Sequence, residues 1–140
     1  MRIHNVPTSA ALSDPGREYR ASEPDAPLRC CLRKSLPDEP VWLFRYSPSS
    51  GKGPYAEVGP IFTHVDCPDE PSLDRLPVEL LNNPRILRSY NAAGQIHDGE
   101  VVELGSFDRV IEGLFNNPEI ESLQVRSVSH GCFYFAITRA

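Results

Sequence analysis

The chain has 140 residues, a length that suits one domain with a single hydrophobic core. Its 14 Lys and Arg against 19 Asp and Glu give a formal net charge of −5, and an acidic chain is repelled by phosphate backbones, so we expect no nucleic acid partner. No apolar stretch has the length that a bilayer span requires, so we also expect no membrane association.

The first half of the chain is predicted to form a polar N-terminal segment followed by strands. Residues 1–26 are polar and contain three prolines, so we expect a poorly structured N-terminal segment. Apolar runs at 30–32 and 41–46 predict two strands, and the Pro-Asp-Glu-Pro turn between them would join them as a hairpin. Residues 47–54 are rich in Ser, Gly and Pro and predict a mobile loop before a third strand at 58–64.

The second half contains the clearest element, a helix at 107–115. A short helix at 77–81 and strands at 85–91 and 100–104 precede it. A hairpin at 123–139 follows it and closes the chain. Apolar residues recur in the helix at spacings of three and four, which places them on one face: Phe107, Val110, Ile111, Leu114 and Phe115.

These elements predict an α+β fold for residues 27–140. We expect a single domain with one mixed, mostly antiparallel sheet of five to seven strands and one principal helix packed on a face. The helix would connect its flanking strands as a right-handed β-α-β crossover.

The four cysteines are expected to be free thiols or metal ligands. The N-terminal residues lack the uninterrupted apolar run of a secretory signal, which favours a cytoplasmic location, where thiols stay reduced. Cys30 and Cys31 would point to opposite faces of the strand at 30–32, so a disulfide between them would be strained.

A zinc site is the first candidate function. His64 and Cys67 lie three residues apart where a strand becomes a loop, and Cys31 and Cys132 could complete a tetrahedral set of three thiolates and one imidazole. Structural zinc sites usually contain a C-x-x-C pair, which this chain lacks. The alternative is that the thiols are small buried hydrophobic side chains, a common use of free cysteine.

A nucleophilic cysteine is the second candidate. Cys132 follows Gly131, which leaves room for a substrate, and either His130 or His64 could serve as the base. The alternative is a hairpin residue that packs beneath the helix.

The third candidate is an anion pocket that contains Arg88 and Arg126, with Glu57 as their carboxylate partner. A structural ion pair is the favoured use of these three charges.

Several sequence blocks carry a resemblance to a known family, and it extends from about residue 27 to the C-terminus. The blocks are Pro27-Leu28-Arg29 with Cys31-Leu32, residues 54–62 with His64 and Cys67, residues 87–90, Val125-Arg126, and Gly131-Cys132-Phe133 with Arg139. In these blocks the chain resembles an uncharacterised bacterial family, domain-of-unknown-function family 1203. Similar proteins tend to read Arg-His-Cys-Leu where this chain has Arg29-Cys30-Cys31-Leu32, and a thiol at position 30 could still ligate a metal. The resemblance implies no activity, cofactor or partner.

Three functions from different classes therefore remain open. The first is a cytoplasmic module that binds a metal, with zinc as the candidate, or a small ligand. The second is a cysteine-dependent enzyme of unknown substrate. The third is a homodimeric protein-interaction domain without catalysis, based on the frequency of two-fold dimers among soluble oligomers.

Overall fold

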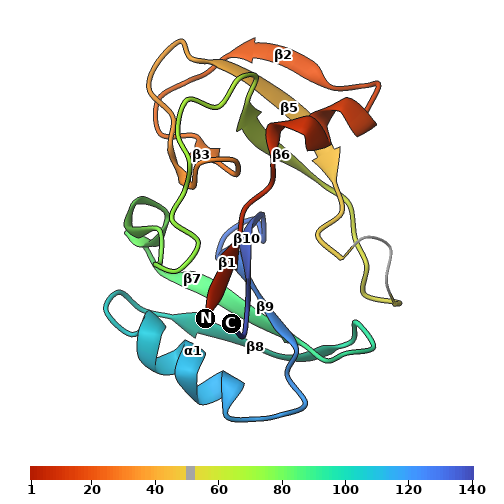
Figure 1. Cartoon of the computed structure of the whole chain (residues 1–140), viewed down its shortest axis with the longest axis vertical. Coiled ribbons are helices and arrows are strands. Elements are labelled where there is room, and N and C mark those ends of the chain that lie inside the picture. Colours follow the sequence, from red (N-terminus) through yellow and green to blue (C-terminus); the bar gives the residue numbers. More distant parts are fainter. Residues whose placement is uncertain (50–52) are drawn as a thin grey trace.

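A computed structural model describes residues 1–49 and 53–140, and its strands form two sheets of five strands each. Figure 1 shows one sheet above the other, with both chain termini at the lower one. The lower sheet has the strand order β1-β10-β9-β7-β8, and its strands are Arg2–His4 (β1), Arg85–Tyr90 (β7), Ile96–Val102 (β8), Ser122–Ser127 (β9) and Phe133–Thr138 (β10). The upper sheet has the order β2-β5-β6-β3-β4, and its strands are Glu18–Ala21 (β2), Pro27–Leu28 (β3), Arg33–Lys34 (β4), Pro40–Tyr46 (β5) and Gly59–His64 (β6).

The predicted single-sheet α+β fold is wrong, because the described residues form a mostly β protein with two sheets. One α-helix, Phe107–Phe115 (α1), is accompanied by two short 3-10 segments, Thr8–Ser13 (η1) and Val78–Leu81 (η2). Among the described residues, strands β2 to β6 pair only with one another, so they build a sheet of their own. Strand propensity reports which segments are extended, and it does not report which of them pair.

The hairpin predicted between 30–32 and 41–46 is also absent from the described residues. Strand β5 occupies the second position of that hairpin, but it pairs with β2 and β6. Residues 30–32 form a turn between β3 and β4, in which Leu32 adopts a φ of 60°. The expected loop at 47–54 includes residues 50–52, which lie outside the described residues.

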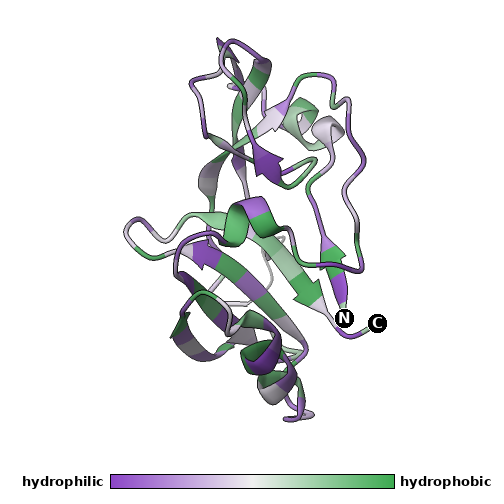
Figure 2. Cartoon of the chain, turned by 90° about the vertical axis from the view of Figure 1, so that its left-hand side faces the viewer, coloured by the Kyte–Doolittle hydropathy of each residue, from purple (hydrophilic) through white to green (hydrophobic). Residues whose placement is uncertain are grey.

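Helix α1 coincides with the predicted amphipathic segment and covers one face of the lower sheet. Phe107 and Ile111 are buried against that sheet, where they join Leu87, Leu123 and Phe135 in the largest apolar cluster. Figure 2 shows green and purple bands along the strands, the period-two pattern of a sheet with one apolar face. Strands β8 and β9 each pair antiparallel with β7, so they run parallel to each other with α1 between them in sequence.

Residues 1–26, expected to be poorly structured, contribute β1, η1 and β2. Strand β1 pairs with β10, and Ile3 is fully buried opposite Ile137. Val6 and Ala11 pack with Phe44 of β5 in a second apolar cluster. A few well-placed apolar residues therefore attach this polar segment to both sheets.

None of the described helices is long and apolar enough to cross a membrane.

An ion pair between Asp14 and Arg45 fastens the end of η1 to β5. The Asp14 carboxylate accepts hydrogen bonds from the backbone N–H of Arg45 at 2.9 Å and from its guanidinium at 3.2 Å. Donation from the Arg45 backbone and side chain, and from the backbone N–H of Gly16, lowers the pKa of Asp14 from 3.8 to about 2. The ionised form of Asp14 is therefore the form that the fold stabilises.

This lowered pKa predicts a pH-dependent effect of Asp14→Asn. A carboxylate with a lowered folded-state pKa stabilises the fold fully above its unfolded pKa of about 3.9, and the stabilisation is lost as the pH falls toward about 2. We expect the free energy of unfolding of the variant to lie below that of the wild type near neutral pH, and the gap to close in acid. Urea denaturation of both proteins across this range measures the gap. A gap that stays constant in acid would contradict the prediction.

Candidate metal centre

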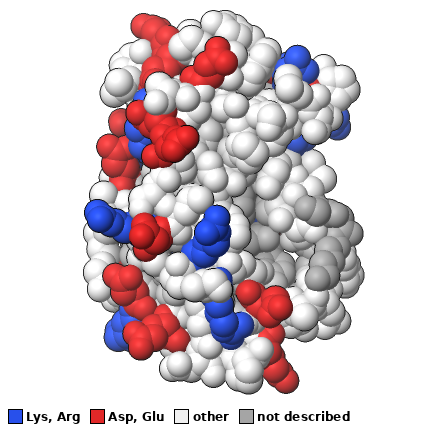
Figure 3. All heavy atoms as spheres, in the orientation of Figure 1, with Lys and Arg blue, Asp and Glu red and all other residues white. Residues whose placement is uncertain are grey.

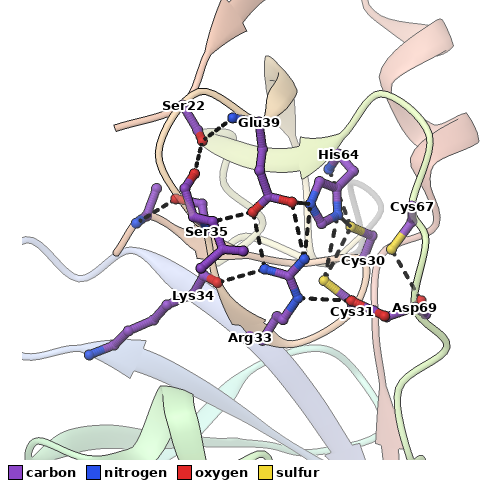
Figure 4. Close-up of polar contacts among 12 residues, drawn as sticks. Ser22, Cys30, Cys31, Arg33, Lys34, Ser35, Glu39, His64, Cys67 and Asp69 are labelled. Atoms are coloured by element: carbon purple, nitrogen blue, oxygen red, sulfur yellow. Dashed lines mark hydrogen bonds and ion pairs between the residues drawn. The ribbon is translucent and has the colours of Figure 1, made fainter. Parts of the chain in front are cut away.

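Four potential metal ligands meet at one end of the upper sheet, shown in Figure 4. Cys30 and Cys31 lie in the turn between β3 and β4, His64 is the last residue of β6, and Cys67 follows in the next loop. The four ligand atoms, three sulfurs and one imidazole nitrogen, all lie within 4.8 Å of one another. Such a set matches the Cys₃His ligand group of zinc sites.

Strand pairing and a tight turn bring these residues together. Strand β3 pairs parallel with β6 through Leu28 and Phe62, and the backbone N–H of Arg29 donates to the Phe62 carbonyl at 2.9 Å. This register places Cys30, two residues after Leu28, beside His64, two residues after Phe62. The left-handed φ of 60° at Leu32 then reverses the chain. Both neighbouring thiols consequently face His64, which an extended strand would not allow.

The distances among three of the ligand atoms match the edges of a zinc tetrahedron. Bond lengths of about 2.3 Å to sulfur and about 2.0 Å to nitrogen place two sulfurs about 3.8 Å apart, and a sulfur and a nitrogen about 3.5 Å apart. The sulfurs of Cys30 and Cys31 are 3.9 Å apart, and they lie 3.6 and 3.7 Å from Nδ1 of His64. These three atoms could therefore bind one ion without large movement.

The imidazole of His64 is oriented by a carboxylate on its other side. Its Nε2 lies 2.7 Å from Oε2 of Glu39, which places the ring proton on Nε2 and leaves the lone pair of Nδ1 directed at the sulfurs. A carboxylate that accepts this N–H is the usual outer partner of a zinc-bound histidine, and it fixes the tautomer and the orientation of the ring.

Arg33 holds that carboxylate in place and keeps it ionised. Its two terminal nitrogens each lie 3.1 Å from an oxygen of Glu39, and its Nε donates to Asp69 at 2.8 Å. This pairing is the main cause that lowers the pKa of Glu39 from 4.5 to about 2. Three thiolates and Zn²⁺ together carry one net negative charge, and the cationic Arg33 would offset it.

Two of these thiols, those of Cys31 and Cys67, favour the protonated state when no cation is present. The hydrogen bond with Cys30, together with burial, raises the pKa of Cys31, and burial raises the pKa of Cys67. A protonated thiol is a poor nucleophile, whereas a bound metal ion deprotonates its thiol ligands. The arrangement thus fits metal binding better than it fits nucleophilic catalysis by these cysteines.

The site is closed to solvent on most sides. Cys30 is 3% exposed, Cys31 7% and His64 2%, while Cys67 is half-buried. The surrounding apolar side chains are Leu28, Val41 and Phe62. If all four groups bound one tetrahedral ion, no coordination position would stay open, as in structural rather than catalytic zinc sites.

Residues 25–139 match the family described as protein of unknown function, DUF1203. The chain belongs to this family. No curated protein and no solved structure matches the chain with significance. The family description of DUF1203 names no activity.

In this DUF1203 chain the metal ligands predicted from sequence are only partly brought together. Cys31, His64 and Cys67 meet, but Cys132 is outside the group, and Cys30 takes its place. Cys30 and Cys31 do not point to opposite faces as predicted, because residues 30–32 form a turn instead of a strand. The signal that could have identified it is the Arg-His-Cys-Leu pattern of similar proteins, because histidine and cysteine are both zinc ligands.

The predicted nucleophile Cys132 has no imidazole partner among the described contacts. Its backbone N–H donates to Ser127 at 3.0 Å, while Nδ1 of His130 lies 3.0 Å from Oγ of Ser129. The other candidate base, His64, is engaged by Glu39 and the two adjacent thiols. The structure therefore shows no thiolate-imidazolium pair at Cys132 within its described residues.

The three charges of the predicted anion pocket do meet. One oxygen of Glu57 accepts a hydrogen bond from Arg88 at 2.8 Å and forms an ion pair with Arg126. Arg126 is 3% exposed and also donates to Oε1 of Gln124 and to the Gly131 carbonyl. Because Glu57 neutralises the buried guanidinium, the contacts agree with a structural ion pair.

Proposed function

We propose that this protein is a zinc-binding domain in which Cys30, Cys31, His64 and Cys67 hold one structural Zn²⁺. The observation that carries the proposal is the pair of contacts at His64, with Nδ1 facing two sulfurs and Nε2 facing the carboxylate of Glu39. Thiolate and imidazole ligands favour zinc over magnesium or calcium, which prefer oxygen.

The zinc ion would stabilise the end of the upper sheet. Strands β3 and β4 have only two residues each, too few to hold the turn between them by backbone pairing alone. Zinc would tie this turn to the end of β6 and to the loop that contains Cys67. We propose that the protein works in the cytoplasm, and its four free cysteines suit that reducing environment.

Cobalt substitution tests the proposal directly. Tetrahedral Co²⁺ with thiolate ligands absorbs visible light strongly, so full-length protein loaded with one equivalent of Co²⁺ should turn intensely coloured. We expect Cys30→Ser to weaken the sulfur-to-cobalt bands and Cys132→Ser to leave them unchanged. A weak spectrum of octahedral type, or equal effects of the two substitutions, would reject the site.

The other functions predicted from the sequence stay predictions. These are a cysteine-dependent enzyme and a homodimeric interaction domain. We also propose that nucleic acid is not a partner. On the face shown in Figure 3, basic side chains lie among acidic ones rather than along a continuous track, and the formal net charge is −5.

A further inference from the structure

A second feature outside the zinc site is the buried guanidinium of Arg29, which follows β3 and is 3% exposed. Its Nε donates to the Phe133 carbonyl at 2.8 Å, and Nη1 donates to the Pro27 carbonyl. An arginine carries five N–H donors, so three of them have no hydrogen-bond partner among the described residues.

No carboxylate in the described part of the chain pairs with this guanidinium, in contrast to Arg126, which pairs with Glu57. Arg85, only 7% exposed, also lacks a carboxylate partner among those residues. Both cations lie over the ring of Tyr134, with their guanidinium carbons 5.0 and 4.7 Å from the ring centroid. A buried charge without a counterion is costly, because the protein interior solvates it poorly. Arg85 donates to the carbonyls of Leu80 and Pro84 and does not line the cavity described next, whereas Arg29 does, so Arg29 is the cation that an anion from outside the chain can reach.

Arg29 borders a cavity of about 300 Å³ at the junction of the two sheets. Strands β3, β5 and β6 supply an apolar wall, and the β9–β10 turn supplies hydroxyl, imidazole and thiol groups. No acidic side chain lines the cavity, and its described lining is Pro27, Arg29, Leu43, Pro60, Phe62, Ser127, Ser129, His130, Cys132 and Tyr134.

We propose that this cavity binds a small organic carboxylate, with the carboxylate on Arg29 and an apolar body against Leu43 and Phe62. A planar carboxylate matches the hydrogen-bonding fork of a guanidinium, and one negative charge suffices to neutralise Arg29. The apolar wall favours a ligand with a hydrocarbon or aromatic group over a bare inorganic ion. None of the four proposed zinc ligands lines this cavity, although Arg29 directly precedes Cys30 and Phe62 lies beside both sites.

Benzoate, benzamide and inorganic phosphate are matched probes for this site. Each is titrated into full-length protein as purified, and binding is followed by NMR through backbone amides and the Nε–H of Arg29. We expect saturable shifts with benzoate at millimolar concentrations, centred on Arg29, Ser127 and Tyr134, and much weaker binding of the uncharged benzamide. Equal binding of benzamide, or stronger binding of phosphate, would overturn the proposed ligand class. Absence of saturation by benzoate, or shifts confined to other residues, would overturn the site.

Substitutions on two sides of the cavity provide the variants. Arg29→Gln removes the charge and is expected to weaken benzoate binding about tenfold or more, since a charge-assisted pair is lost. Arg20→Gln is the control, because it removes an exposed arginine whose partner is Glu18. Leu43→Trp fills the cavity at a half-buried strand position and keeps Arg29, so it tests the site even if Arg29→Gln fails to fold. Wild-type benzoate affinity in Leu43→Trp, or in folded Arg29→Gln, would contradict the proposal.

Discussion

Replacing Cys31 with serine is expected to abolish tight zinc binding and to lower the melting temperature strongly. The binding free energy of a structural zinc ion is part of the folding free energy, so the loss of one ligand weakens both. We expect a loss of about 3 kcal/mol, which corresponds to a melting temperature lower by roughly 10 °C in a domain of this size. Thermal unfolding followed by circular dichroism measures the change.

Two comparisons make the Cys31→Ser result specific. Cys132→Ser is the same substitution at a half-buried thiol outside the ligand group, and it should melt close to the wild type. A chelator should lower the melting temperature of the wild type and of Cys132→Ser, but it should have little further effect on Cys31→Ser. Equal behaviour of the two variants, with and without chelator, would show that the ligand group holds no structural metal.

Glu39→Gln is expected to weaken zinc binding by about 10- to 100-fold, the usual effect of losing an outer carboxylate partner of a zinc-bound histidine. The amide still reaches Nε2 of His64, but it no longer polarises the ring or pairs as an anion with Arg33. Competition with a chromophoric chelator of known zinc affinity gives the change.

Glu57→Gln is the matched control for this prediction. It also removes a carboxylate that pairs with arginine, in this case Arg88 and Arg126, but Glu57 contacts none of the proposed zinc ligands among the described residues. Its zinc affinity should equal that of the wild type. An unchanged affinity in Glu39→Gln, or an equal loss in both variants, would remove the role assigned to Glu39.

The positions of elements that depend only on their own local sequence were predictable. Helix α1 occupies residues 107–115 as its apolar spacing predicts. An amphipathic helix of this length needs only one apolar surface on which its apolar face can pack. Strand β5 is likewise found where the apolar run at 41–46 predicts it. The division into two sheets was not predictable from such patterns, because it depends on pairing between distant segments. Strand β2 joins β5 although all of its residues are exposed, so no apolar alternation marks it.

The candidate site shows the same limit at the level of single residues. His64 and Cys67 could be chosen from sequence because they lie close together at the end of an apolar strand. The choice between Cys30 and Cys132 depended on whether residues 30–32 are extended or turned. The turn depends on the left-handed backbone conformation of Leu32. This conformation is uncommon for residues other than glycine, asparagine and aspartate. Local sequence gives little warning of it.

The zinc content of protein expressed without a polyhistidine tag and purified under reducing conditions tests the central claim most directly. Elemental analysis should find one zinc ion per chain in the wild type and none in a variant with serine at both Cys30 and Cys31. A wild-type protein that contains no zinc and takes up none when zinc is supplied would contradict the account, as would full zinc content in the double variant.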